Sequence, residues 1–163
     1  MNPIITKKFV YFITGASGVG KTTLVDLLEK KYKTRGDIAF LKFDTTGVPS
    51  VAEQIRRYSS PSEWQRATTK VWISKILHEI KKTIVLFEGQ VNFDFIYEAF
   101  AAQQFSDFVV ILIDCDEEEM ERRLKQERNQ GELVPSGYEK LAKVSTQTGR
   151  ESSCTHNQYC IQK

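Results

Sequence analysis

The sequence predicts an α/β domain built around a mostly parallel β-sheet. Short apolar runs recur at 9–13, 84–87 and 108–113, and segments of helical length and pattern separate them. The second and third runs are continuously apolar, as in strands that are buried on both faces of a parallel sheet. A glycine-rich segment directly after the first run is the third observation, because such a segment joins a strand to a helix.

The first half of the chain holds two predicted strands and three predicted helices. Strands are expected over 8–14, which is apolar up to the glycine-rich segment, and over 38–43, which ends at an aspartate. A helix over 21–32 places leucines on one face and lysines in its last turn, where they suit the helix dipole. A Ser-Ser-Pro run ends a short helix over 51–58, and the capping-box spacing of Ser62 and Gln65 begins a long helix over 62–81.

The second half continues this alternation and then loses it. Strands are predicted over 83–88 and 108–115, and Asn92 can cap a helix over 93–104 between them. A highly charged helix is expected from Asp116 to about Asn129. Only Tyr159–Ile161 could then form a last short strand. We therefore expect one domain over 1–144 and an irregular tail over 145–163.

Composition excludes several functional classes. The 163 residues include 40% apolar and 27% charged residues, which is typical of an ordinary globular domain. A net charge of +2 gives no reason to expect nucleic acid or a membrane surface as a partner. The longest apolar runs are far shorter than the roughly 20 residues of a membrane span. Three cysteines, an odd number, favour a reduced, cytoplasmic protein, and Cys154, His156 and Cys160 match no standard zinc spacing.

The glycine-rich segment carries the most specific signal in the chain. Gly15–Thr22 reads Gly-Ala-Ser-Gly-Val-Gly-Lys-Thr and matches the phosphate-binding motif G-x-x-x-x-G-K-[ST] in full. Its glycines let backbone N–H groups point at phosphate oxygens, and the following helix adds the positive end of its dipole. Lys21 can neutralise the β- and γ-phosphates, and the Thr22 hydroxyl can bind Mg²⁺. We expect ATP and Mg²⁺ to bind here, at Gly15, Ala16, Ser17, Gly18, Val19, Gly20, Lys21, Thr22 and Thr23.

With this loop near its start, the chain from residue 8 to about 144 resembles the P-loop small-molecule and nucleotide kinases, which include adenylate, shikimate and gluconate kinases. An acid after the second strand, an acid after the third and an arginine-bearing helix after the fourth also match. The resemblance implies a three-layer P-loop NTPase fold with a parallel sheet in the order 2-3-1-4-5, here with a weak or irregular fifth strand. It also implies transfer of the γ-phosphoryl group of Mg-ATP to a small hydroxyl-bearing acceptor.

The resemblance also suggests roles for residues at the ends of the second and third strands. In similar kinases an acid at the position of Asp44 touches the acceptor hydroxyl as a base or an orienter, although Asp44 also suits a simple turn. Glu88 would emerge beside Thr22 and serve as an outer-shell Mg²⁺ partner or a base. Gly89 would leave room for the substrate, and Gln90 could hydrogen-bond it.

Arginines complete the expected site. Arg56 and Arg57 lie in the segment that covers the acceptor in similar kinases, where they could hold an acidic group. Arg122, Arg123 and Arg128 lie on the helix that corresponds to the lid, and we expect Arg123 or Arg128 to contact the nucleotide or the transferred phosphoryl group. Acidic residues four positions earlier make surface ion pairs the alternative for two of them.

Other functions remain open at this stage. A nucleoside monophosphate kinase would need positive charge rather than a base for its acceptor. A nucleotide-binding protein without turnover would keep Lys21 and Thr22 and lose the chemistry. A regulatory GTPase is less favoured, because the chain contains no N-K-x-D motif for guanine although Asp44–Gly47 formally matches D-x-x-G.

Overall fold

The computed structural model describes residues 7–116, 118–119, 122 and 158–162. The elements follow in the order β1 (Phe9–Thr14), α1 (Lys21–Lys31), β2 (Ile38–Lys42), the 3₁₀ helix η1 (Phe43–Thr46), α2 (Val51–Tyr58), α3 (Pro61–His78), β3 (Ile84–Glu88), α4 (Phe93–Ala102), β4 (Phe108–Asp114) and β5 (Gln158–Gln162). The predicted elements are confirmed in kind and order over these residues, with ends that move by up to three residues. The predicted helix after Asp116 lies largely outside the described residues.

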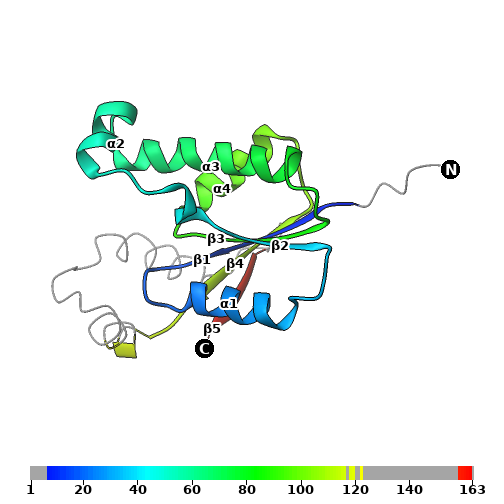
Figure 1. The fold of residues 1–163 in the computed structure, drawn as a ribbon. Helices are drawn as coiled ribbons and strands as arrows, with labels where there is room; N and C mark the ends of the chain where they lie inside the picture. Colours follow the sequence, from blue (N-terminus) through cyan, green and yellow to red (C-terminus); the bar gives the residue numbers. More distant parts are fainter. Residues whose placement is uncertain (1–6, 117, 120–121, 123–157, 163) are drawn as a thin grey trace, which may run out of the picture.

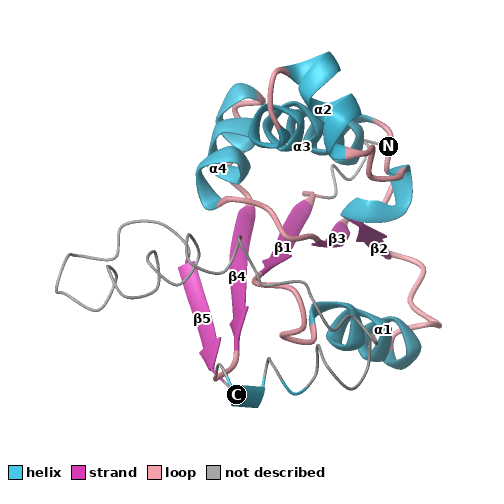
Figure 2. Cartoon of the chain, turned by 90° about the vertical axis from the view of Figure 1, so that its left-hand side faces the viewer, coloured by secondary structure: helices cyan, strands magenta, loops and turns pink. Residues whose placement is uncertain are grey.

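The five strands form one parallel sheet in the order β2-β3-β1-β4-β5, as Figure 2 shows. This is the order that the resemblance to P-loop kinases implies. β1 lies between β3 and β4, and Ile13 and Lys42 are both paired in register with Glu88. The carboxyl ends of β1, β2 and β3 therefore meet at one edge of the sheet, where the sequence analysis places the site.

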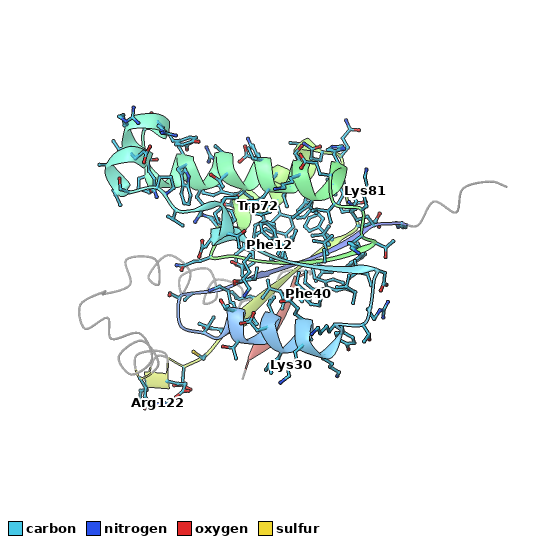
Figure 3. All side chains as sticks on the ribbon, viewed as in Figure 1. Phe12, Lys30, Phe40, Trp72, Lys81 and Arg122 are labelled. Atoms are coloured by element: carbon cyan, nitrogen blue, oxygen red, sulfur yellow. The ribbon has the colours of Figure 1, made fainter. Side chains whose placement is uncertain are left out.

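Helices cover both faces of the sheet. Figures 1 and 2 show α2, α3 and α4 on one face and α1 on the other. In Figure 3, Phe12 and Trp72 lie between the sheet and the layer that contains α3, whereas Phe40 lies between the sheet and α1. The larger core therefore forms under α3 and α4, and its fully buried members include Phe12, Ile73, Ile76, Phe87, Ile96 and Phe100. Trp72 and Phe95 are also members of this core.

Side-chain caps fix where the helices on that face begin. Ser50 accepts a hydrogen bond from the backbone N–H of Glu53, and Ser60 accepts one from Glu63. The predicted start of the long helix is thus wrong. Its first residue is Pro61 and not Ser62, and its cap is Ser60 and not Ser62. Pro61 takes the first helical position, which suits its fixed φ angle.

The amino edge of the sheet is tied to the far end of α3. The Nζ of Lys8 donates to the backbone carbonyls of Ile76, Leu77 and Ile80, at 2.5, 3.1 and 2.6 Å. Ile76 and Leu77 belong to the last turn of α3, whose carbonyls have no partner further along the helix, and Ile80 lies two residues beyond its end.

No helix among the described residues is long and apolar enough to cross a membrane.

Candidate active site

The phosphate loop joins β1 to α1 at the carboxyl edge of the sheet. Gly15, Gly18 and Gly20 have φ angles of 147°, 85° and 95°, a region that side chains disfavour. A Cβ on Gly15 would also lie 2.2 Å from the carbonyl oxygen of Ile113 on β4. Gly20 is the N-cap of α1, and the first turn of a helix presents backbone N–H groups that can bind an anion. The loop has the backbone that its sequence motif predicts.

Lys21 is folded back onto this loop. Its Nζ donates to the backbone carbonyls of Gly15 at 3.0 Å and Ala16 at 2.7 Å, and only 9% of the residue is exposed. A buried ammonium needs such acceptors, because burying a charge without them is costly. The lysine therefore sits inside the loop with its charge held beside the N–H groups that would receive phosphate.

Thr22 and Glu88 meet beside the loop. The Thr22 hydroxyl donates to the Glu88 carboxylate over 3.1 Å, and Glu88 is buried at the end of β3. The backbone N–H of Gly89 donates to the Ile13 carbonyl at 3.0 Å, so the end of β3 is held against β1. The predicted juxtaposition of Glu88 and Thr22 is thus present in the structure.

The environment of Glu88 suits a cation. Burial raises the pKa of Glu88 above its ordinary value of 4.5. The charge of Asp44 adds to the rise in this pKa, whereas the Thr22 hydrogen bond, Lys21 and Lys42 oppose it. A hydroxyl and a partly desolvated carboxylate are oxygen donors of the kind that Mg²⁺ binds directly or through water. The two side chains therefore fit a Mg²⁺ ion bound together with the phosphates of a nucleotide.

Asp44 lies two residues beyond the end of β2. The predicted strand over 38–43 ends at Lys42, and Asp44 belongs to the 3₁₀ helix η1. The backbone carbonyl of Asp44 accepts a hydrogen bond from the N–H of Gly47 at 3.0 Å. Asp44 is exposed, and it lies close enough to Glu88 for its charge to affect the pKa of that carboxyl. Asp44 therefore forms part of the turn and lies close to Glu88, and its role toward an acceptor stays a prediction.

Lys42 is a charged residue at this edge that the sequence analysis did not single out. Its Nζ pairs with Asp26 on α1 at 2.6 Å, and that hydrogen bond raises the pKa of Lys42. Its position opposite Glu88 in the register of β2 and β3 explains why the two charges interact. The alternation of the strand could have indicated this position, but the partner on α1 could not be read from the sequence.

The segment after β3 is packed against its neighbours. A Cβ on Gly89 would lie 2.6 Å from the Cβ of Phe43, so packing against Phe43 accounts for a glycine at this position, and its role beside a substrate stays a prediction. Gln90 is exposed, and its carbonyl accepts from the side chain of Gln65 at 2.9 Å. The side-chain oxygen of Gln65, Oε1, also accepts a hydrogen bond from the backbone N–H of Asn92 at 3.2 Å. Gln65, expected in a capping box, instead ties α3 to this segment.

The arginines that the structure describes pair with nearby acids. Arg56 and Arg57 are exposed on α2 and both pair with Glu53, at 3.6 and 2.5 Å. Arg122 pairs with Glu119 at 2.7 Å, three residues earlier rather than four. The lid residues Arg123 and Arg128 lie outside the described residues, so their contact with nucleotide stays a prediction.

Comparison with known proteins places the fold. Among solved structures, the chain is similar to a sugar kinase from Janibacter sp. HTCC2649, with a TM-score of 0.56, 12% identity and coverage of 95% of this chain and 85% of that one. It is similar to shikimate kinase from Acinetobacter baumannii in complex with shikimate, with a TM-score of 0.56, 17% identity and coverage of 93% and 83%. It is also similar to the Mycobacterium tuberculosis APS kinase in complex with AMPPNP and APS, with a TM-score of 0.50, 17% identity and coverage of 93% of this chain and 79% of that one.

These structural likenesses confirm the fold of the P-loop kinases for this chain. No curated protein sequence matches it significantly. The family model that matches is described as an AAA domain, and it spans residues 12–140, which include the phosphate loop and the ends of β2 and β3. The chain therefore belongs to the AAA domain family and has the parallel-sheet fold seen in the sugar and shikimate kinases.

Proposed function

We propose that this protein is an ATP-dependent kinase that transfers the γ-phosphoryl group of Mg-ATP to a small hydroxyl-bearing acceptor. One observation carries the proposal: a complete phosphate loop lies at the same sheet edge as two carboxylates, Glu88 at the end of β3 and Asp44 in the 3₁₀ helix that follows β2. A protein that only bound nucleotide would need the loop but not the second, exposed carboxylate. The kinase names of the structural neighbours agree with the proposal.

The loop residues would bind and orient the triphosphate. The backbone N–H groups between Gly15 and Thr22 would donate to phosphate oxygens, and the Lys21 ammonium, which now donates to two carbonyls of the loop, would neutralise the β- and γ-phosphates. Thr22 and Glu88 would hold Mg²⁺, which neutralises charge on the transferring group. Because the transition state of phosphoryl transfer is loose, positioning and charge stabilisation account for most of the rate gain.

Asp44 is the group we assign to the acceptor. It is exposed at the same edge as the phosphate loop, so its carboxylate can reach a hydroxyl that approaches the γ-phosphate. There it would accept the hydroxyl proton or orient the hydroxyl oxygen for attack. Arg123 or Arg128 of the lid helix would contact the nucleotide or the transferring phosphoryl group.

The proposal is tested by measuring ATP consumption with nucleosides, sugars and nucleoside monophosphates as acceptors. For a hydroxyl acceptor, Asp44→Asn should slow turnover by roughly 10²- to 10⁴-fold. The double variant Arg56→Ala/Arg57→Ala should be mild, because both arginines are exposed and share one acidic partner. Glu79→Gln, a change at an exposed acid beyond α3, serves as the control.

The same experiment separates the rival functions. A phosphate acceptor is already ionised and needs positive charge, so normal turnover by Asp44→Asn together with a dead arginine double variant would show a monophosphate kinase. If no compound raises ATP consumption above the basal rate of the wild type, the kinase proposal fails and binding without turnover is favoured.

A further inference from the structure

An ion pair between Lys42 and Asp26 joins β2 to α1. The Nζ of Lys42 donates to the Asp26 carboxylate at 2.6 Å, and the two side chains are 34% and 54% exposed. An ion pair that is exposed to this degree contributes little to the stability of a fold. What sets this one apart is its place in the site, because it lies next to the groups that would bind the nucleotide and its Mg²⁺ ion.

Each partner of the pair neighbours one partner of the contact between Thr22 and Glu88. Asp26 follows Thr22 by four residues, so both side chains lie on the same side of α1, one turn apart. Lys42 is paired in register with Glu88, so their side chains lie on the same face of the sheet. The hydrogen bond from Thr22 to Glu88 and the ion pair from Lys42 to Asp26 are therefore two adjacent contacts between α1 and the sheet.

The turn that carries Asp44 is anchored from both faces of the sheet. β2 is an outer strand, and within the described sheet it is hydrogen-bonded to β3 alone (Figure 2). Phe43, the first residue of η1, is buried in the larger core under α3. Lys42 reaches Asp26 on the opposite face, and its backbone carbonyl accepts a hydrogen bond from the Thr45 hydroxyl at 2.7 Å. Lys42 therefore connects η1 to the helix that follows the phosphate loop.

We propose that the ion pair between Lys42 and Asp26 positions Asp44 against the nucleotide held by the phosphate loop. The inference rests on the proposed kinase function and adds two positioning residues to its site. The first residues of α1, Lys21 and Thr22, belong to the phosphate loop, so α1 keeps a fixed place relative to the phosphates. The ion pair one turn further along then fixes the end of β2, and with it Asp44, relative to the same phosphates. Phosphoryl transfer depends on such positioning, and a misplacement of about 1 Å can lower the rate about 100-fold.

The test separates turnover from nucleotide binding. Lys42→Met and Asp26→Asn each remove one partner of the pair, and each should lower kcat roughly 10-fold or more with the nucleoside or sugar that most stimulates ATP consumption by the wild type. The Kd for Mg-ATP, measured by isothermal titration calorimetry, should change by less than about 2-fold. The double variant should be no slower than the slower single variant, because both changes remove the same contact. Lys42→Arg keeps the pair and should turn over nearly as fast as the wild type.

A second measurement tests whether the pair acts through Asp44. Once Asp44→Asn has removed the carboxylate that the pair positions, adding Lys42→Met should lower kcat by less than about 2-fold further. A pair that served only the stability of the fold would lower kcat by the same factor whether or not Asp44 is present.

Lys70→Met is the matched control. Lys70 and Glu98 form an ion pair of 2.7 Å between α3 and α4, on the other face of the sheet from α1 (Figure 1), and both side chains are 44% exposed. Its kcat should not move, and the thermal unfolding midpoints of all variants should stay close to that of the wild type. An unchanged kcat in Lys42→Met, a loss of Mg-ATP affinity in that variant, or equal losses of kcat with and without Asp44 would overturn the inference and leave the kinase proposal standing. Stimulation by nucleoside monophosphates alone, or by no compound, would overturn both.

Discussion

The two edges of the sheet each hold a lysine whose ammonium group donates to backbone carbonyls. At the carboxyl edge, Lys21 donates to Gly15 and Ala16, which lie six and five residues away in the phosphate loop. At the amino edge, Lys8 donates to three carbonyls of the last turn of α3 and the residues after it, about 70 residues away. The contacts are of the same kind, but they differ in what they connect.

This difference separates a contact that serves binding from one that serves stability. The acceptors of Lys21 belong to a glycine-containing loop with positive φ angles, and a phosphate oxygen can replace them. Two of the acceptors of Lys8, Ile76 and Leu77, are carbonyls of the last turn of α3, which have no partner further along the helix and need another donor in the folded protein. Lys8 therefore joins β1 to α3 permanently, whereas Lys21 is held ready for a ligand.

The largest expected effect is that of Lys21→Ala on nucleotide binding. Removing the ammonium leaves the triphosphate without its main positive charge, so the affinity for Mg-ATP should fall roughly 10²- to 10³-fold. Isothermal titration calorimetry measures this, with Lys30→Ala as the control, because Lys30 is an exposed lysine in the last turn of the same helix (Figure 3). An unchanged affinity in Lys21→Ala would contradict the assignment of the phosphate loop.

Gly89→Ala probes packing at the same edge. The new Cβ would lie 2.6 Å from Phe43, and relieving that overlap should lower the free energy of unfolding by roughly 1–3 kcal/mol. Gly36→Ala is the control, because a Cβ there would meet nothing within 4 Å. Urea unfolding compares the two variants. Equal stability would show that Phe43 can move away and that the space beside Gly89 is available after all.

Lys8→Met should have a smaller effect than Lys21→Ala, and it should change stability rather than nucleotide binding. Loss of the donor at the end of α3 should lower the free energy of unfolding by about 1–2 kcal/mol, with little change in the affinity for Mg-ATP. Lys7→Met is the control, because Lys7 is exposed and makes only a surface ion pair with Asp107. A loss of nucleotide affinity in Lys8→Met would remove the distinction between the two edges.

The sequence was most informative where function requires particular residues next to one another. The phosphate loop could be predicted in full, because its glycines, lysine and threonine act within eight consecutive residues. The strand order could be predicted only through the resemblance to P-loop kinases, since apolar runs identify strands but not their neighbours. The position of Glu88 beside Thr22 followed from that order.

Contacts between distant residues could not be predicted. Gly89 is required by Phe43, which lies 46 positions earlier, so the local sequence gave no means of separating a packing role from a substrate role. Gln65 satisfied a local capping pattern, yet it bonds to Gln90 and Asn92 across the fold. The start of α3 could have been placed correctly, because a proline favours the first helical position and a serine precedes it.

The smallest expected effect is a pH dependence that Lys8 confers on stability. Burial lowers the pKa of Lys8 below its ordinary value of 10.5, and the charge of Lys81 lowers it further. In the unfolded chain the amine keeps the ordinary pKa, so the unfolded state binds more protons in the window between the lowered pKa and 10.5. The free energy of unfolding contributed by this group should therefore rise with pH across that window.

The measurement is the difference in thermal unfolding midpoint between the wild type and Lys8→Met, followed from neutral pH to 10.5. Titration of other groups cancels in this difference, and we expect the advantage of the wild type to grow as the pH rises. The pair Lys7→Met and wild type should show no such growth, because Lys7 is exposed. A wild-type advantage that shrinks instead would mean that the positive charge at the end of α3 stabilises the helix dipole by more than its burial costs. Lys8 would then act mainly through its positive charge, as Lys21 is expected to do at the other edge of the sheet.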